Sequence, residues 1–191
     1  MPTPLATLPP PPERGAGRAL RRALRHAAFA LGAASLCSAA LGCAATGLPP
    51  SAPSALLGKP LPEITRRALD QSAIDTKSNR GSVVVVKFFA KYCEPCKKTL
   101  PLVERLHESR AKVVFIGVDE DEYASEAEEM VRTFGLTFPV VHDAGNALAG
   151  RYRVAQLPMT FVADGSGTIR WVADENQKDD ELERALDAVQ P

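Results

Sequence analysis

Residues 83–98 read VVVVKFFAKYCEPCKK, and this stretch decides the fold more than any other part of the chain. The near-continuous apolar run from Val83 to Phe89 predicts a central strand that is buried on both faces. A short turn follows, and residues 94–109 then place their apolar side chains on one face of a predicted helix. Cys93 and Cys96 therefore fall where a buried strand meets the N-terminus of a helix.

That position favours redox chemistry. Free backbone N–H groups and the positive end of the helix dipole favour a thiolate at Cys93, and Cys96 lies one helical turn further on. A thiolate is the nucleophile of disulfide exchange, and a neighbouring cysteine can resolve the mixed disulfide. A zinc site is disfavoured because no second Cys or His pair follows at the required spacing. A purely structural disulfide is disfavoured because a two-residue loop constrains an unfolded chain poorly.

The rest of the chain alternates strand and helix patterns. Strands are expected at residues 113–118, 138–142, 160–163 and 168–172, and helices at 125–134, 146–152 and 179–189. Ser125 and Glu128 are expected to form a capping box, and residues 164–167 a hairpin turn. An extended segment is expected at residues 63–68, before a turn. This order predicts an α/β fold in which helices flank a central mixed sheet.

The N-terminal region does not read as part of this domain. Five arginines between residues 14 and 25 precede the uncharged stretch 27–42, which is the pattern of a signal sequence. The end of the stretch, Ala40-Leu41-Gly42-Cys43, resembles a bacterial lipoprotein cleavage site with Cys43 as the lipidated residue. An uncleaved signal anchor and a plain secretory signal are the alternatives. We therefore expect a signal or anchor over residues 1–43, a flexible linker over 44–56 and a domain over 57–191, outside the cytosol.

Charge and the remaining titratable residues point to no other chemistry. The chain has 23 basic and 23 acidic residues, so nothing indicates nucleic-acid binding. The acidic residues between 120 and 129 are expected to form a solvated loop and helix face, with metal binding a weaker alternative. His107 and His142 are expected at the surface or at strand ends, and Trp171 in packing or at the site rim. Cys37 is expected to be a small apolar residue of the signal. We expect no metal site.

A family resemblance adds to this interpretation. Residues 88–98 and the later segment Leu157-Pro158-Met159-Thr160 resemble the ResA/TlpA-type membrane-tethered thiol–disulfide oxidoreductases of the thioredoxin-like superfamily. The resemblance runs from about residue 57 to the C-terminus and implies a thioredoxin-like fold, with residues 125–142 as an extra αβ insertion. It implies that Cys93 attacks and that the more buried Cys96 resolves. It also implies that a cis Pro158 lies opposite the cysteines and presents the Leu157 backbone to substrate.

The resemblance further implies partners and residues that tune the redox potential. Clients would be protein disulfides, with apocytochrome c as the best-known family client, and electrons would come from a membrane thiol-transfer protein, without a cofactor. Glu94 and Pro95, between the cysteines, and Tyr92, where the family usually has Trp, are expected to tune the pair. Thr99 stands where relatives often carry Glu.

Lys87 occupies the strand position where relatives carry Asp or Asn. Its charge could lower the thiol pKa values, or burial could remove that charge. Alternatively, Lys87 could extend its amine to the surface.

Two other functions compete with disulfide reduction. A thiol peroxidase of the peroxiredoxin-like group shares a related fold, but no Pro-x-x-x-Thr-x-x-Cys context precedes Cys93. A non-enzymatic Cu(I)-binding module could use the two soft cysteine ligands. The sequence leaves the direction of electron flow open.

Overall fold

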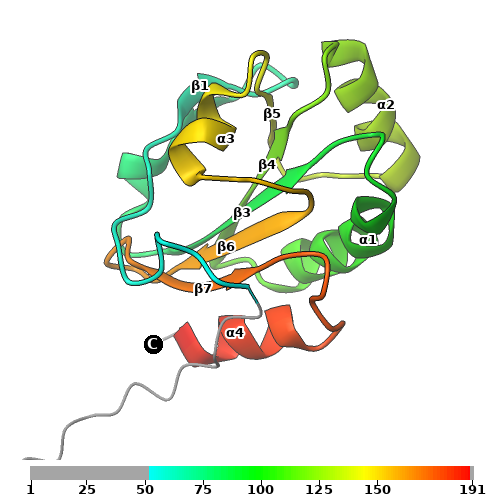
Figure 1. The fold of residues 1–191 in the computed structure, drawn as a ribbon. Coiled ribbons are helices and arrows are strands. Elements are labelled where there is room, and N and C mark those ends of the chain that lie inside the picture. Colours follow the sequence, from blue (N-terminus) through cyan, green and yellow to red (C-terminus); the bar gives the residue numbers. More distant parts are fainter. Residues whose placement is uncertain (1–51, 190–191) are drawn as a thin grey trace, which may run out of the picture. The chain divides into compact units, whose positions relative to one another are not determined.

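A five-stranded mixed sheet forms the centre of the molecule in the computed structural model, which describes residues 52–189. Its strands are β3 (Val83–Phe89), β4 (Val113–Asp119), β5 (Val140–His142), β6 (Met159–Ala163) and β7 (Ile169–Ala173), in the order β5-β4-β3-β6-β7 (Figure 1). Strands β3, β4 and β5 are parallel to one another. Strands β6 and β7 run antiparallel to their neighbours. The predicted mixed sheet is confirmed, with the apolar run of β3 at its centre.

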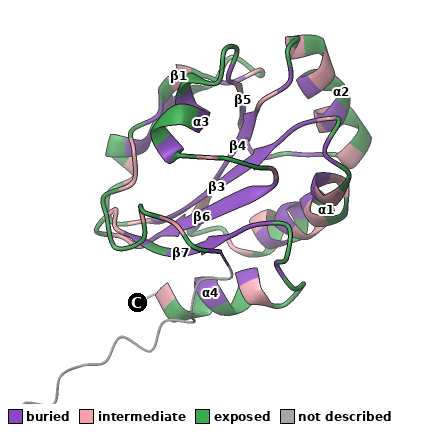
Figure 2. Cartoon of the chain, in the orientation of Figure 1, coloured by how far each residue is buried: buried purple, intermediate pink, exposed green. Residues whose placement is uncertain are grey.

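Helices cover both faces of this sheet. They are α1 (Glu94–Ser109), α2 (Ala124–Phe134), α3 (Ala147–Tyr152) and α4 (Glu181–Val189). Leu100 of α1, Met130 of α2 and Leu186 of α4 belong to the apolar cluster on one face. Leu148 and Tyr152 of α3 belong to the apolar cluster on the other face. We call these two clusters the α1-side cluster and the α3-side cluster. Figure 2 shows most of the sheet buried, while the helices expose their outer faces, as the amphipathic patterns predicted.

A small second sheet precedes the central one. Strand β1 (Thr65–Arg67) pairs antiparallel with β2 (Ala73–Asp75), and the 3₁₀ helix η1 (Thr76–Asn79) follows. The first strand lies in the predicted extended segment, but β2 was not predicted. Its three residues include one buried side chain, Ile74, which is too short a pattern to indicate a strand.

The folded part of the chain begins before residue 57. Ala52 is buried and its N–H donates to the carbonyl of Val172 at 3.2 Å, while Leu56 packs against the α3-side cluster. The expected linker over residues 44–56 is therefore wrong at its C-terminal end. Cys37, Cys43 and the expected signal lie outside the described residues. Within residues 52–189, no helix combines the length and apolarity needed to cross a bilayer.

The start of α2 also differs from the expectation. The helix begins at Ala124 with Tyr123 as its N-cap, and no side chain caps it. Ser125 lies inside the first turn, two residues after the N-cap position, so the predicted capping box with Glu128 is wrong. The helix ends at Phe134, and its C-cap Gly135 has a φ of 60°, the left-handed conformation that glycine adopts at low cost.

Candidate active site

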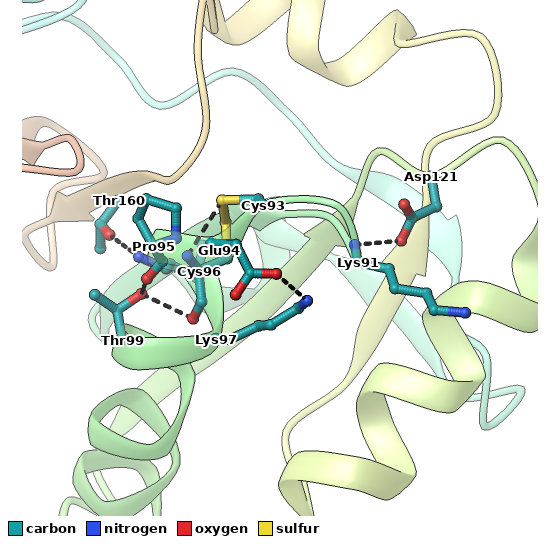
Figure 3. Close-up of a disulfide and its surroundings, with 10 residues drawn as sticks. Lys91, Cys93, Glu94, Pro95, Cys96, Lys97, Thr99, Asp121 and Thr160 are labelled. Carbon is teal, nitrogen blue, oxygen red and sulfur yellow. Dashed lines mark hydrogen bonds and ion pairs between the residues drawn. A yellow bond between two sulfur atoms is a disulfide. The ribbon is translucent and has the colours of Figure 1, made fainter.

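Cys93 and Cys96 form a disulfide at the start of α1 (Figure 3). Cys93 is the N-cap of the helix, and the Cys96 N–H donates to its sulfur at 3.2 Å. Cys93 is the cysteine nearer the surface: it is 5% exposed, whereas Cys96 is fully buried. A helix N-terminus favours negative charge on the N-cap sulfur once the disulfide is opened.

The residues around the pair are held by the first turns of α1. Pro95 lies in the first turn, where a missing N–H costs nothing. Glu94 points outward and pairs with Lys97 at 2.5 Å. The Thr99 hydroxyl donates to the helix carbonyls of Cys96 at 3.2 Å and Pro95 at 3.4 Å (Figure 3). Position 99 thus carries a hydroxyl bonded within the helix.

A cleft of about 680 Å³ opens beside Cys93. Leu157 lines it, and the peptide bond between Leu157 and Pro158 is cis, as the resemblance implied. Tyr92, which is 70% exposed, forms part of the same wall. The structure therefore brings Tyr92, Cys93 and Leu157, from two distant segments, to one cleft.

Lys87 is buried inside the domain, so the surface position considered for its amine is wrong. It is 1% exposed, and its Nζ donates to the Thr160 hydroxyl of β6 at 3.0 Å. Burial lowers the pKa of Lys87 from its ordinary value of 10.5 to about 7. Strand β3 alternates its side chains, so Lys87 shares a face with Val85 and Phe89, which belong to the apolar cluster that contains both cysteines.

Two acidic side chains at the end of β4 are buried, and one of them, Asp121, belongs to the acidic stretch. Asp121 is buried, and its carboxylate accepts the Lys91 N–H at 2.7 Å, which ties the end of β4 to the loop that leads into Cys93. Asp119 is fully buried, and burial followed by the neighbouring Asp121 raises its pKa to about 8. The expectation of a solvated loop is therefore wrong for Asp121, which is buried with its carboxylate bonded to the Lys91 N–H.

Glu120 is the site residue that sequence analysis missed. Its N–H donates to the carbonyl of Phe89 at 3.0 Å, and its side chain lines the Cys93 cleft. Burial, followed by the charge of Asp143, raises the pKa of Glu120 to about 7. The available signal was its place directly after a predicted parallel strand, since the carboxyl ends of adjacent parallel strands meet at one edge of a sheet.

The contacts of His107 and His142 are with residues other than the cysteines. His142 ends β5, as expected, and its Nδ1 lies 3.0 Å from Asp119 Oδ2. His107 is half-buried, with its ring packed edge-on against Phe115 and Phe138. Trp171 is buried in the α1-side cluster, so its role is packing. No group of three metal-binding side chains occurs among the described residues.

Residues 57–172 match the AhpC/TSA family. The chain belongs to the AhpC/TSA family. This family member is 30% identical to the thiol-disulfide oxidoreductases ResA of Bacillus thuringiensis (strain Al Hakam) and Bacillus anthracis, over 137 residues in each case. The alignment covers 71% of this chain and 79% of each relative. The protein is a thiol–disulfide oxidoreductase of the ResA type.

Solved structures of low sequence identity share its fold. StoA from Bacillus subtilis superposes with a TM-score of 0.58 at 21% identity, covering 68% of this chain and 98% of StoA. The thioredoxin domain of a thiol-disulfide oxidoreductase from Bacteroides vulgatus gives 0.61 at 20% identity, covering 70% and 98%. The AhpC/TSA protein therefore has the thioredoxin-like fold that the resemblance implied.

Proposed function

We propose that this oxidoreductase reduces disulfides of client proteins with the Cys93–Cys96 pair. The observation that supports this most is the asymmetry of the pair: the Cys93 sulfur caps a helix beside an open cleft, whereas Cys96 is fully buried. Only one of the two sulfurs is placed for contact with a macromolecule.

In the proposed cycle, the Cys93 thiolate attacks a client disulfide. A mixed disulfide forms and one client thiolate leaves, which takes up a proton. The Cys96 thiolate then attacks the Cys93 sulfur, which releases the second client thiolate and closes the Cys93–Cys96 disulfide. Two electrons have passed to the client, and a donor dithiol of a membrane thiol-transfer protein restores the reduced pair.

Leu157 and Pro158 are proposed to hold the client segment during exchange. Leu157 lines the cleft next to Cys93, so its backbone can pair with an extended client segment. Tyr92, Glu94 and Pro95 are proposed to tune the potential of the pair. Apocytochrome c is the proposed client, and lipidation at Cys43 is proposed to hold the domain on the outer side of the membrane.

Trapping experiments test the assignment of the two cysteines. In the reduced full chain, Cys96→Ser should accumulate a mixed disulfide with a disulfide-bonded client such as insulin, because the resolving thiol is absent. Cys93→Ser should accumulate none, and iodoacetamide should label Cys93 much faster than Cys96 at neutral pH. Equal labelling would contradict the assignment, and trapping only by Cys93→Ser would reverse it.

A peroxide assay separates this function from the thiol peroxidase alternative. The reduced protein should transfer electrons to insulin disulfides far faster than to hydrogen peroxide. Faster consumption of peroxide would favour the peroxidase instead. Stoichiometric Cu(I) binding without insulin reduction would favour the copper-binding module.

A further inference from the structure

The wall of the Cys93 cleft is negatively charged. Glu94, Glu120 and Glu175 line it, and no Lys or Arg does. Glu94 is paired with Lys97, whereas Glu120 and Glu175 make no ion pair with any residue in the range 52–189. A client segment must approach this wall to reach the Cys93 sulfur.

A second hollow extends the negative surface. It also measures about 680 Å³ and adjoins the first at Tyr92, Glu120 and Asn146. Its further lining includes three more acids and two lysines: Asp121, Glu122, Glu126, Lys91 and Lys97. Both lysines are already paired, with Glu129 at 2.7 Å and Glu94 at 2.5 Å. The charge left for a partner is therefore negative over both hollows.

Two features at the junction of the hollows suit a cationic side chain. The exposed ring of Tyr92 lies there, and an aromatic face next to carboxylates attracts ammonium and guanidinium groups. Partial burial, followed by the charges of Glu120 and Asp121, raises the pKa of the Tyr92 hydroxyl, so the negative field reaches this residue. In addition, Glu120 Oε1 is buried without a hydrogen-bond partner in the described part of the chain.

We propose that this cleft selects client disulfides that are flanked by lysine or arginine. The cationic side chain lies against Tyr92 and donates to Glu120, while the client cysteine meets the Cys93 sulfur. This inference rests on the proposed function, because it names the substrate class of the same site. Complementary charge raises the rate of encounter and aligns the client segment before exchange.

Two disulfide peptides test the selection. They are identical except that two lysines or two glutamates flank the cysteines, and each oxidises the reduced full chain under second-order conditions. Each rate is divided by the rate of the same peptide with dithiothreitol, which corrects for intrinsic disulfide reactivity. We expect the lysine peptide to be preferred by about tenfold at low ionic strength. In about 1 M salt, where the screening length is near 3 Å, the preference should largely vanish.

Variants locate the source of the preference. At about pH 8, above the Glu120 pKa of about 7 so that most of Glu120 is ionised, Glu120→Gln and Glu175→Gln should each reduce it by about threefold, as expected for the loss of one charge near a surface. Glu108→Gln is the matched control, because Glu108 is an exposed acid at the far end of α1 and should leave the preference unchanged.

Equal corrected rates for the two peptides, or a preference that survives in both cleft variants, would overturn the inference. Those results would leave the proposed function intact. If instead neither peptide reacts faster than with Cys93→Ser, the proposed function itself fails.

Discussion

At the scale of single residues, the burial of Lys87 lowers the free energy of unfolding at neutral pH. The folded protein holds its pKa near 7, against 10.5 in the unfolded chain. Between these values the unfolded chain binds more protons, so this residue makes stability rise with pH across that window. Lys87→Met should raise the free energy of unfolding at pH 7 by about 4 kcal/mol. The gain should shrink toward pH 10, as measured by urea unfolding at several pH values, and a gain independent of pH would contradict this account.

The same residue is expected to influence the redox potential. Lys87 shares a strand face with residues that pack against both cysteines, so a proton on its amine stabilises a thiolate there. Lys87→Asn, which keeps a polar side chain, should therefore make the disulfide less oxidising and slow alkylation of Cys93 near neutral pH. The potential is measured by equilibration with glutathione. An unchanged potential and alkylation rate, in a variant that remains folded, would show that Lys87 has no part in the redox chemistry.

At the scale of elements, α3 depends on one buried carboxylate. Asp143 is fully buried and accepts the N–H groups of Leu148 at 2.7 Å and Ala149 at 3.0 Å, at the N-terminus of that short helix. Asp143→Ala should lower the free energy of unfolding by about 3 kcal/mol, because two buried donors lose a charged acceptor. Glu128→Ala, which removes an exposed acid of α2 paired with Arg132, is the control and should change it by less than about 0.5 kcal/mol. Equal effects in a denaturation series would contradict the role of Asp143.

At the scale of the whole molecule, buried groups of both signs shape the dependence of stability on pH. Asp119 and Glu120 have pKa values raised to about 8 and about 7, so the folded state binds more protons than the unfolded chain above pH 4. Stability therefore falls as pH rises toward those values, whereas Lys87 makes it rise above pH 7. We expect a stability minimum between about pH 7 and 8.

Urea unfolding from pH 5 to 10 at constant ionic strength measures this profile. Glu120→Gln should flatten the acidic limb, and Lys87→Met should flatten the alkaline limb. A stability maximum near pH 7.5 in the unmodified protein would contradict the opposing windows. Carboxyl groups with lowered pKa values, such as Asp164, titrate below pH 5 and therefore do not change the position of the stability minimum.

The strand–turn–helix unit that carries the cysteines could be predicted from the residues, as could the order of every element from β3 to α4. These features are local: a long apolar run, a helix with one apolar face and a Cys-Glu-Pro-Cys turn each specify their own conformation. The surroundings of the two sulfurs, in contrast, depend on how distant segments pack. Glu120, Asn146 and Glu175 reach the cleft from three separate loops, and no local pattern records which loops meet.

The burial of charged side chains also depends on the packing of distant segments. Lys87 and Asp119 are charged by residue type, and only the packing of helices and neighbouring strands over them removes water and shifts their pKa values. The three-residue strand β2 was likewise set by pairing with β1, because so short a segment has too little pattern of its own. Solvation is a property of all the chain segments that cover a residue, which is why it required the folded molecule.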